Sequence, residues 1–330
     1  MMRQRLVTII AALSLAARLG AGEAEVLQDL KYGTPEKREA ALEQVLMGQA
    51  PGAGPALLQI LGESQGANRL KVIRGLGLVR EDGAVKPLLE LLSDPGSEFR
   101  LQAARSLGSI GDPAAAPGLV KALEDADVEV REAAARALGA CGSPKDLDSL
   151  KPLLKDKNRL MRMAAIESIG RLGSAAALPV LQEQMQNADP AYKRIVVKAI
   201  GALKGTDIDA SLKLWLSDKD DYLRGFTAEA LALHAPTKSL EPGLIKLLSD
   251  PNIAVRIRAI EALGAWKSKA AVPAIAKALR AEEPTLRWKA AVALGAIGDA
   301  SAKEALDYVA EHDTEVEVKK AAKQAAEGLK

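Results

Sequence analysis

Apolar residues recur along most of the chain with a helical spacing, and the whole pattern then repeats. In residues 125–142, DADVEVREAAARALGACG, apolar residues stand one position before Arg131 and three, four and seven positions after it. This spacing places them on one stripe of a helix. The position of Arg131, which we call the index position, recurs ten times, at Arg38, Arg69, Arg100, Arg131, Arg162, Lys193, Arg224, Arg256, Arg287 and Val318. Successive index positions are 31 residues apart, with one interval of 32, and a fixed period of about 20–50 residues is typical of a solenoid.

A shorter leucine-rich segment precedes each of these helices, as at Val85–Asp94, Gly118–Asp125 and Gly243–Asp250. Most repeats also carry glycine eight positions after the index position, interrupted in the interior by Ala232. We predict an all-α protein, an α-solenoid of about ten repeats of two antiparallel helices. One pair has too little apolar surface to be stable alone, so stacking against its neighbours completes the core.

These residues carry a resemblance to a known family. Residues 94–112 (DPGSEFRLQAARSLGSIGD) and 250–264 (DPNIAVRIRAIEALG) follow a pattern DP-x-x-x-VR-x-x-A-x-x-ALG-x-IGD. This pattern resembles HEAT repeats, and specifically the short repeats of the phycobilisome-lyase type. The resemblance covers about residues 30–330 and implies the solenoid fold, which hosts many different activities.

The first residues do not follow the repeat. Met1–Arg5 is basic, residues 6–17 (LVTIIAALSLAA) are apolar, and residues 18–24 (RLGAGEA) are mostly small. We interpret residues 1–24 as a signal peptide, cleaved after Ala21 or Ala24, because the apolar run is shorter than the roughly 20 residues that cross a membrane. The domain division is therefore a signal peptide at 1–24 and one solenoid domain at 25–330. This predicts a bacterial protein that is periplasmic or secreted and has no membrane span.

Composition narrows the possible partners. Residues 1–24 hold three of the 45 basic residues and one of the 43 acidic residues, so 42 of each remain. A nucleic-acid-binding domain is expected to carry a basic excess, so we predict no nucleic-acid partner. Cys141 is the single cysteine, which excludes an intramolecular disulfide. We expect a monomer with no cofactor.

The index arginines and the aspartates six positions before them form the clearest charge pattern. Such an aspartate can cap the second helix of its repeat, and an arginine close to the packed face needs a carboxylate from its own or the adjoining repeat. The resemblance implies that this ladder is structural. Ala281 and His312 interrupt the acidic series, so Arg287 is expected to lack its local partner. The predicted ladder comprises Asp94, Arg100, Asp125, Arg131, Asp156, Arg162, Asp218, Arg224, Asp250 and Arg256. A row of cations for an anionic partner is the alternative.

The position one after the index lies well away from the apolar stripe, yet several repeats place an apolar residue there. Exposed apolar residues aligned across repeats indicate a binding surface, and tryptophan is enriched at binding hot spots. The candidate partner-binding residues at this position are Leu70, Leu101, Met163, Ile257 and Trp288. The alternative is that neighbouring helices partly cover these side chains.

Five positions after the index, three consecutive repeats carry arginine: Arg74, Arg105 and Arg136. They are candidates for binding an acidic protein, a glycan or a lipid headgroup, and an ordinary solvated face is the alternative. Cys141, His234 and Trp266 share a core position, ten after the index, and are expected to be structural.

Catalytic patterns are weak. His234 and His312 lie in different repeats, and neither begins the His-Glu pairs that HEAT-type deoxyhypusine hydroxylases use for their metal. We find no phosphate-binding glycine loop and no nucleophile motif. The predicted function is a non-catalytic, exported scaffold or assembly factor that binds protein through its second helices, with no metal site. The alternative is a lyase or chaperone-lyase for a cofactor-bearing protein, as the resemblance to bilin lyases implies.

Overall fold

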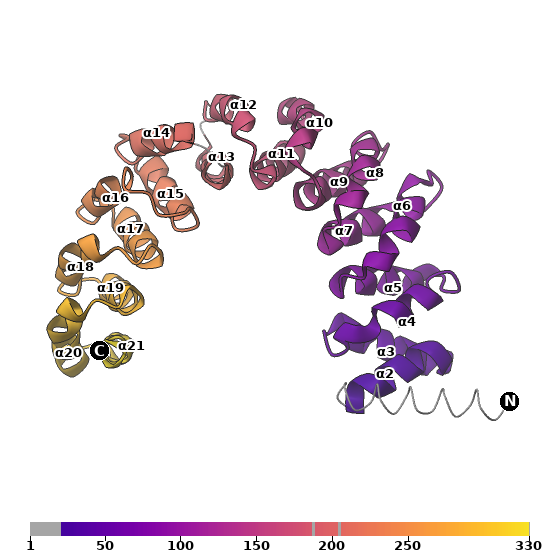
Figure 1. Ribbon diagram of the computed structural model, residues 1–330, viewed down its shortest axis with the longest axis horizontal. Helices are drawn as coiled ribbons and strands as arrows, with labels where there is room; N and C mark the ends of the chain where they lie inside the picture. The colour runs from indigo at the N-terminus through magenta and orange to yellow at the C-terminus, as the bar shows by residue number, and fades with distance from the viewer. Residues whose placement is uncertain (1–20, 187–188, 204–205, 330) are drawn as a thin grey trace. The chain divides into compact units, whose positions relative to one another are not determined.

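The computed structural model describes residues 21–186, 189–203 and 206–329, and these residues form helices and turns without a β-strand (Figure 1). The sequence pattern predicts pairs of helices, and the structure confirms it. The second helix of each pair contains the index position. These helices are α3 (Pro35–Leu46), α5 (Gly66–Leu78), α7 (Arg100–Ile110), α9 (Val128–Cys141), α11 (Arg159–Leu172), α13 (Pro190–Ala202), α15 (Asp221–Leu231), α17 (Ile253–Ala265), α19 (Pro284–Ile297) and α21 (Val316–Gly328).

The first helices of the pairs are generally shorter. They are α2 (Ala21–Tyr32), α4 (Gly54–Ile60), α6 (Val85–Ser93), α8 (Ala116–Ala122), α10 (Leu147–Leu150), α12 (Leu178–Gln184), α14 (Thr206–Trp215), α16 (Glu241–Leu247), α18 (Val272–Ala278) and α20 (Lys303–His312). Most of the predicted signal peptide, residues 1–20, lies outside the described residues. Its last four residues, 21–24, belong to α2.

Short 3₁₀ turns precede many of the first helices, which the sequence pattern did not predict. These turns are η1 (Pro51–Ala53), η2 (Asp82–Ala84), η3 (Pro113–Ala115), η4 (Pro144–Asp146), η6 (Ala175–Ala177), η7 (Lys269–Ala271) and η8 (Ala300–Ala302). The turn η5 (Lys151–Lys155) instead follows α10, because Pro152 has no N–H group to continue that helix. The first helices therefore present less regular backbone than the second helices do.

Consecutive second helices pack unusually closely, and the glycines eight after the index make this possible. A Cβ atom on Gly108 would lie 2.9 Å from the Cα atom of Ala137, and one on Gly139 would lie 2.7 Å from the Cα atom of Ser168. The Ser168 hydroxyl also donates a hydrogen bond of 2.7 Å to the carbonyl of Ala135 on the preceding second helix. The repeated glycine therefore marks the point where one backbone rests directly on the next.

The chain divides into two compact units, with the boundary between Ser168 and Ile169, inside α11. Within each unit the second helices form one row and the first helices form the other (Figure 1). Leucines from both rows, such as Leu119 of α8 and Leu138 of α9, are completely buried between them. The opposite side of the second helices is open to solvent in each unit, and we call it the second-helix face.

Candidate protein-binding surface

The index arginines are anchored first by backbone carbonyls of their own repeat. Nη1 of Arg131 donates to the carbonyls of Asp125 and Ala126, at 2.6 and 3.0 Å. The same bonds, to the carbonyls six and five positions earlier, recur at Arg162, Arg224, Arg256 and Arg287. Each arginine thereby holds the turn that leads into its own helix, which supports the structural interpretation of the ladder.

Carboxylate pairing, where it occurs, runs to the following repeat. Arg224 makes a two-pronged contact with Asp250, at 2.7 and 3.0 Å, and Arg100 contacts Asp125 at 2.8 and 3.4 Å. The Asp250 side chain is only 5% exposed. Burial raises the pKa of Asp250, but the hydrogen bonds from Arg224 and from the Asn252 N–H, together with the charges of Arg224 and Arg256, outweigh it, so that the pKa lies below its usual range. These pairs connect one repeat to the next.

Arg287 has no carboxylate at the local position, which is Ala281, but it pairs with an acidic residue of the following repeat. Nε and Nη2 of Arg287 contact the two carboxylate oxygens of Asp313, at 2.7 and 2.9 Å. The Arg287 guanidinium holds the pKa of Asp313 below its usual range. Asp313 stands one position beyond His312, so a search for acidic residues at a fixed spacing misses it.

The aspartates of the ladder do not cap the second helices, contrary to the sequence expectation. Asp125 accepts a hydrogen bond from the N–H of Asp127, and Asp127 in turn accepts one from the N–H of Glu129. Asp127 is therefore the N-cap of α9. The same relay recurs at Asp156–Asn158, Asp218–Asp220 and Asp250–Asn252, and Asp94 accepts from the N–H of Gly96. The ladder aspartate thus shapes the turn, and the residue two positions later caps the helix.

Trp288 and Val292 are the most exposed of the apolar residues on the second-helix face of α19. Trp288 is 36% exposed and Val292, one turn later, is 45% exposed. The ammonium group of Lys289 lies 5.0 Å from the centre of the Trp288 ring and also pairs with Glu261. Within the described residues the Trp288 indole donates no hydrogen bond, and part of the side chain is exposed.

The other apolar candidates differ in their exposure. Leu70 is 40% exposed, whereas Leu101, Met163 and Ile257 are half-buried. These three side chains are partly covered, which is the outcome that the alternative sequence interpretation allows. Leu70, Leu101 and Met163 belong to the first unit, and Ile257 and Trp288 belong to the second.

The three arginines five positions after the index fall into two classes. Arg136 pairs with Glu132 on its own helix and with Glu167 on the next second helix, so it is not a free cation. Arg74 and Arg105 are exposed, and neither forms an ion pair with any residue that the structure describes. The predicted patch of three arginines is therefore reduced to two.

Side chains ten positions after the index connect each repeat to the end of the preceding second helix. Trp266 donates from Nε1 to the carbonyl of Leu231 at 2.7 Å, and Cys141 donates from Sγ to the carbonyl of Leu107 at 3.2 Å. His234 Nδ1 lies 3.0 Å from the carbonyl of Gly201. Burial raises the pKa of the Cys141 thiol to about 11, which keeps it protonated and unreactive at neutral pH.

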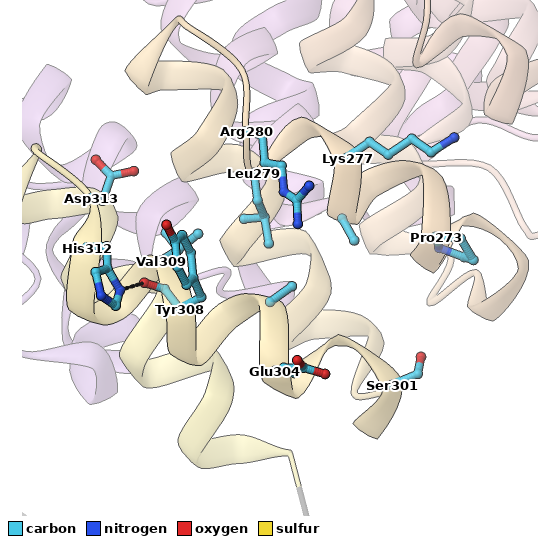
Figure 2. Close-up of a pocket in the computed structure, with 12 residues that line it drawn as sticks. Pro273, Lys277, Leu279, Arg280, Ser301, Glu304, Tyr308, Val309, His312 and Asp313 are labelled. Carbon is cyan, nitrogen blue, oxygen red and sulfur yellow. Dashed lines mark hydrogen bonds between the residues drawn. The ribbon is translucent and has the colours of Figure 1, made fainter.

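A pocket of about 680 Å³ lies between α18 and α20, on the side of the first helices (Figure 2). The Tyr308 and His312 rings stack there with their centres 4.4 Å apart, and Lys277 of α18 and Arg280 of the turn that follows α18 line the opposite side. A similar pocket of about 510 Å³ lies between α6 and α8. Because corresponding hollows occur in different repeats, we attribute them to the spacing of the first helices.

The described residues contain no group of three or more histidine, cysteine, aspartate or glutamate side chains placed to hold a metal ion. Among these same residues, no helix combines the length and the apolar character needed to cross a membrane. The chemistry available on the second-helix face is thus that of exposed apolar and charged side chains.

Three solved structures are similar to this chain at low identity. An engineered protein shares 21% identity over 93% of this chain and 94% of its own, with a TM-score of 0.45. The complex of CpcE and CpcF of phycocyanin lyase from Nostoc sp. PCC7120 shares 22% identity over 84% and 94%, with a TM-score of 0.44. Human deoxyhypusine hydroxylase in complex with glycerol shares 22% over 77% and 98%, with a TM-score of 0.34. All three scores are below 0.5, so none of these structures bears on what this chain binds or catalyses.

No curated protein matches the sequence. The family model of HEAT repeats, in contrast, matches residues 54–133, 116–201 and 241–327, which together make up more than half of the chain. HEAT repeats commonly mediate protein interactions. The matched segments contain most of the index arginines and most of the glycines that bring the second helices together, and the chain belongs to the HEAT repeat family.

Proposed function

We propose that this protein is an exported, non-catalytic scaffold that binds a partner protein through its second-helix face. The observation that carries the proposal is the apolar stripe on α19, where Trp288, Val292 and Ala296 succeed one another at intervals of one turn and are all exposed. On α13 and α15 of the same unit, the charged pair Arg194–Glu229 occupies this face. An exposed apolar stripe among charged pairs is typical of a binding site.

Trp288 is the proposed anchor of the contact. Its ring is large and held in place by Lys289, so binding a partner immobilises little additional side-chain freedom. Aromatic anchors of this kind contribute about 2 kcal/mol or more when they are hot spots. We therefore expect Trp288→Ala to leave the fold nearly intact and to weaken partner binding by about 2 kcal/mol or more.

The non-catalytic part of the proposal is supported by the state of the cysteine and histidine side chains, which are the usual nucleophiles and bases. The Cys141 thiol is buried and donates to a backbone carbonyl. The ring nitrogen Nδ1 of His234 is engaged by the carbonyl of Gly201, and that of His312 by the carbonyl of Tyr308. The exposed apolar and charged side chains therefore suit protein binding better than they suit catalysis.

The export part of the proposal rests on residues 1–24. Within α2, the Glu23 carboxylate accepts a hydrogen bond of 2.8 Å from the N–H of Gly52. Cleavage after Ala21 retains this contact and cleavage after Ala24 removes it, so we propose cleavage after Ala21. The intact mass of the protein from its native host is expected to correspond to a chain beginning at Gly22. Recovery of the full-length chain in the cytosol would refute export.

The binding proposal is tested with wild-type protein and two variants as bait in the envelope fraction of the native host. Trp288→Ala removes the anchor. Leu214→Ala is the matched control, because Leu214 lies on first helix α14 of the same unit and is 69% exposed. The expected result is a partner retained by wild type and by Leu214→Ala and lost from Trp288→Ala, with similar thermal midpoints for all three. If Trp288→Ala unfolds at a much lower temperature and still retains the partner, then Trp288 is a core residue and the proposed site is wrong.

A further inference from the structure

Two arginines of adjacent second helices stand out because their charges are unmatched. Arg74 of α5 and Arg105 of α7 occupy the same position in consecutive repeats, five after the index. Both side chains are exposed, and no described residue forms an ion pair with either of them. This distinguishes them from index arginines such as Arg131 and Arg224, whose guanidinium groups are held by carbonyls or carboxylates.

The surrounding ion pairs explain why Arg74 and Arg105 have no carboxylate partner among the described residues. On the α3 side, Lys71 pairs with Glu39 and Glu43, at 2.8 and 2.7 Å, which uses both carboxylates. On the α9 side, Arg136 pairs with Glu132 and Glu167. The carboxylates on each side are therefore engaged by Lys71 or by Arg136, and neither Arg74 nor Arg105 pairs with them. The unmatched positive charge is confined to two repeats and is bounded by carboxylates on both sides.

The surface between the two arginines is a shallow hollow of about 340 Å³. Gln102, Ser106 and Ser109 of α7 line it together with Leu78 of α5. The Ser106 hydroxyl donates to the carbonyl of Ile73 at 2.8 Å, and Gln102 donates to the Ser106 hydroxyl at 3.4 Å. These bonds hold the floor of the hollow in place. No acidic side chain lines it, so an entering carboxylate meets no like charge from the lining.

Apolar side chains lie on either side of Arg74 along the same helix. Leu70 stands one turn before it and is 40% exposed, and Leu78 stands one turn after it and is 48% exposed. An occupant with carboxylates alone leaves both leucines facing water. One that also carries an apolar side chain covers them, and each buried methylene contributes about 0.8 kcal/mol.

We propose that the α5–α7 part of the second-helix face binds an acidic segment of a partner protein, in which two carboxylates pair with Arg74 and Arg105 and an apolar side chain contacts Leu70 or Leu78. Packed helices lie about 8–10 Å apart, and three residues of a polyproline II segment make one turn and span about 9 Å. Two acidic residues three positions apart in such a segment lie on the same side of it and therefore match the arginines. The segment runs across the second helices, from α5 to α7.

The same geometry disfavours a polyanion. Binding of nucleic acid or of an anionic membrane surface uses many cations spread along a surface. Here the carboxylates of Glu39 and Glu43 on one side and of Glu132 and Glu167 on the other repel a longer anion. A short acidic segment places its charges on the two arginines and avoids these glutamates.

The proposal rests on the proposed function only in taking the second-helix face as a protein-binding surface, and its test does not involve Trp288. The probe is a panel of short fluorescent peptides, each with two glutamates at a varied separation and a leucine between them. Matched peptides carry glutamine in place of glutamate. Binding is measured by anisotropy at several salt concentrations, with wild type and with the double variant Arg74→Gln/Arg105→Gln. The control is Lys86→Gln/Lys121→Gln, which removes two exposed cations from first helices α6 and α8 of the same unit.

We expect the glutamate peptides to bind wild type most tightly when the glutamates are about 9 Å apart. Their affinity for the arginine variant is expected to be about tenfold or more lower than their affinity for wild type. The lysine variant is expected to bind as wild type does, and both variants are expected to keep the wild-type thermal midpoint. Equal binding by the arginine variant and wild type, or equal binding of glutamate and glutamine peptides, would overturn the proposal. So would binding of phosphatidylglycerol vesicles or of an oligonucleotide, lost in the arginine variant, with no binding of any glutamate peptide. A partner captured by wild type and still captured by Trp288→Ala would count against the proposed function alone.

Discussion

Gly139 offers the strictest test of how the repeats stack, because its substitution by alanine adds a single methyl group. The new Cβ atom would lie 2.7 Å from the Cα atom and 2.8 Å from the Cβ atom of Ser168. Carbon atoms in favourable contact are about 3.5–4.0 Å apart, so α9 and α11 must separate locally by roughly 1 Å. Overpacking of this kind costs about 1–3 kcal/mol. The higher helix propensity of alanine offsets about 1 kcal/mol, which leaves a net loss of about 1 kcal/mol at the middle of that range.

Urea denaturation followed by circular dichroism measures this loss, and a second glycine provides the control. A Cβ atom on Gly201 would meet the Cβ atom of Ala230 at 3.0 Å, with the next atom 3.8 Å away. Ala230→Gly is therefore expected to relieve most of the cost of Gly201→Ala. For Gly139→Ala no such relief is available, because the obstacle is the backbone of Ser168. A Gly139→Ala protein as stable as wild type would mean that the close approach of the second helices is not required.

The remaining predictions concern the ladder and the core. Arg224→Ala is expected to destabilise the protein more than Arg131→Ala, because it leaves the buried carboxylate of Asp250 unpaired, and each loss is expected to be about 1–3 kcal/mol in urea denaturation. The depressed pKa of Asp313 contributes stability that is fully present above the unfolded-state pKa of about 4 and is lost as the pH falls through the folded-state value. Acidification below about pH 4 is therefore expected to lower the thermal midpoint of Asp313→Asn by less than it lowers that of wild type. Leu138→Ala, at a fully buried position, is expected to cost about 2–5 kcal/mol through the cavity that it leaves.

The repeat period made the helix pairs predictable, since every repeat encodes the same stripe and the same glycine. The details that sequence reasoning missed depend on relations between repeats. Arg287 finds Asp313 in the next repeat, one position away from the expected register. The N-cap of α9 is Asp127, although Asp125 stands at the more regular position. A search at one fixed spacing cannot tell which of two nearby acidic residues makes the contact, because a side chain can reach one or two positions along the chain.

The pairing of Arg136 could have been found in the sequence. Glu132 stands four positions before it, the spacing at which side chains of a helix meet, and Glu167 occupies the same column one repeat later. The partial burial of Leu101 and Met163 is harder to predict from the sequence. Their exposure depends on how closely the neighbouring second helices approach, and that distance follows from the glycine contacts of several repeats together.

The arginines of this chain show how one residue type serves two purposes in a repeat protein. At the index position the guanidinium lies within reach of two carbonyls of its own turn, as at Arg131, and of the next repeat's carboxylate, as at Arg224. Five positions later the side chain points away from that turn, and its partners are whatever neighbouring second helices place in the same column. Glu167 in that column pairs with Arg136, and Glu43 in the same column pairs with Lys71, so Arg74 and Arg105 keep two charges that an acidic segment can pair with. Substitutions at the position five after the index therefore alter the binding surface, and they leave the contacts that stack the repeats unaltered.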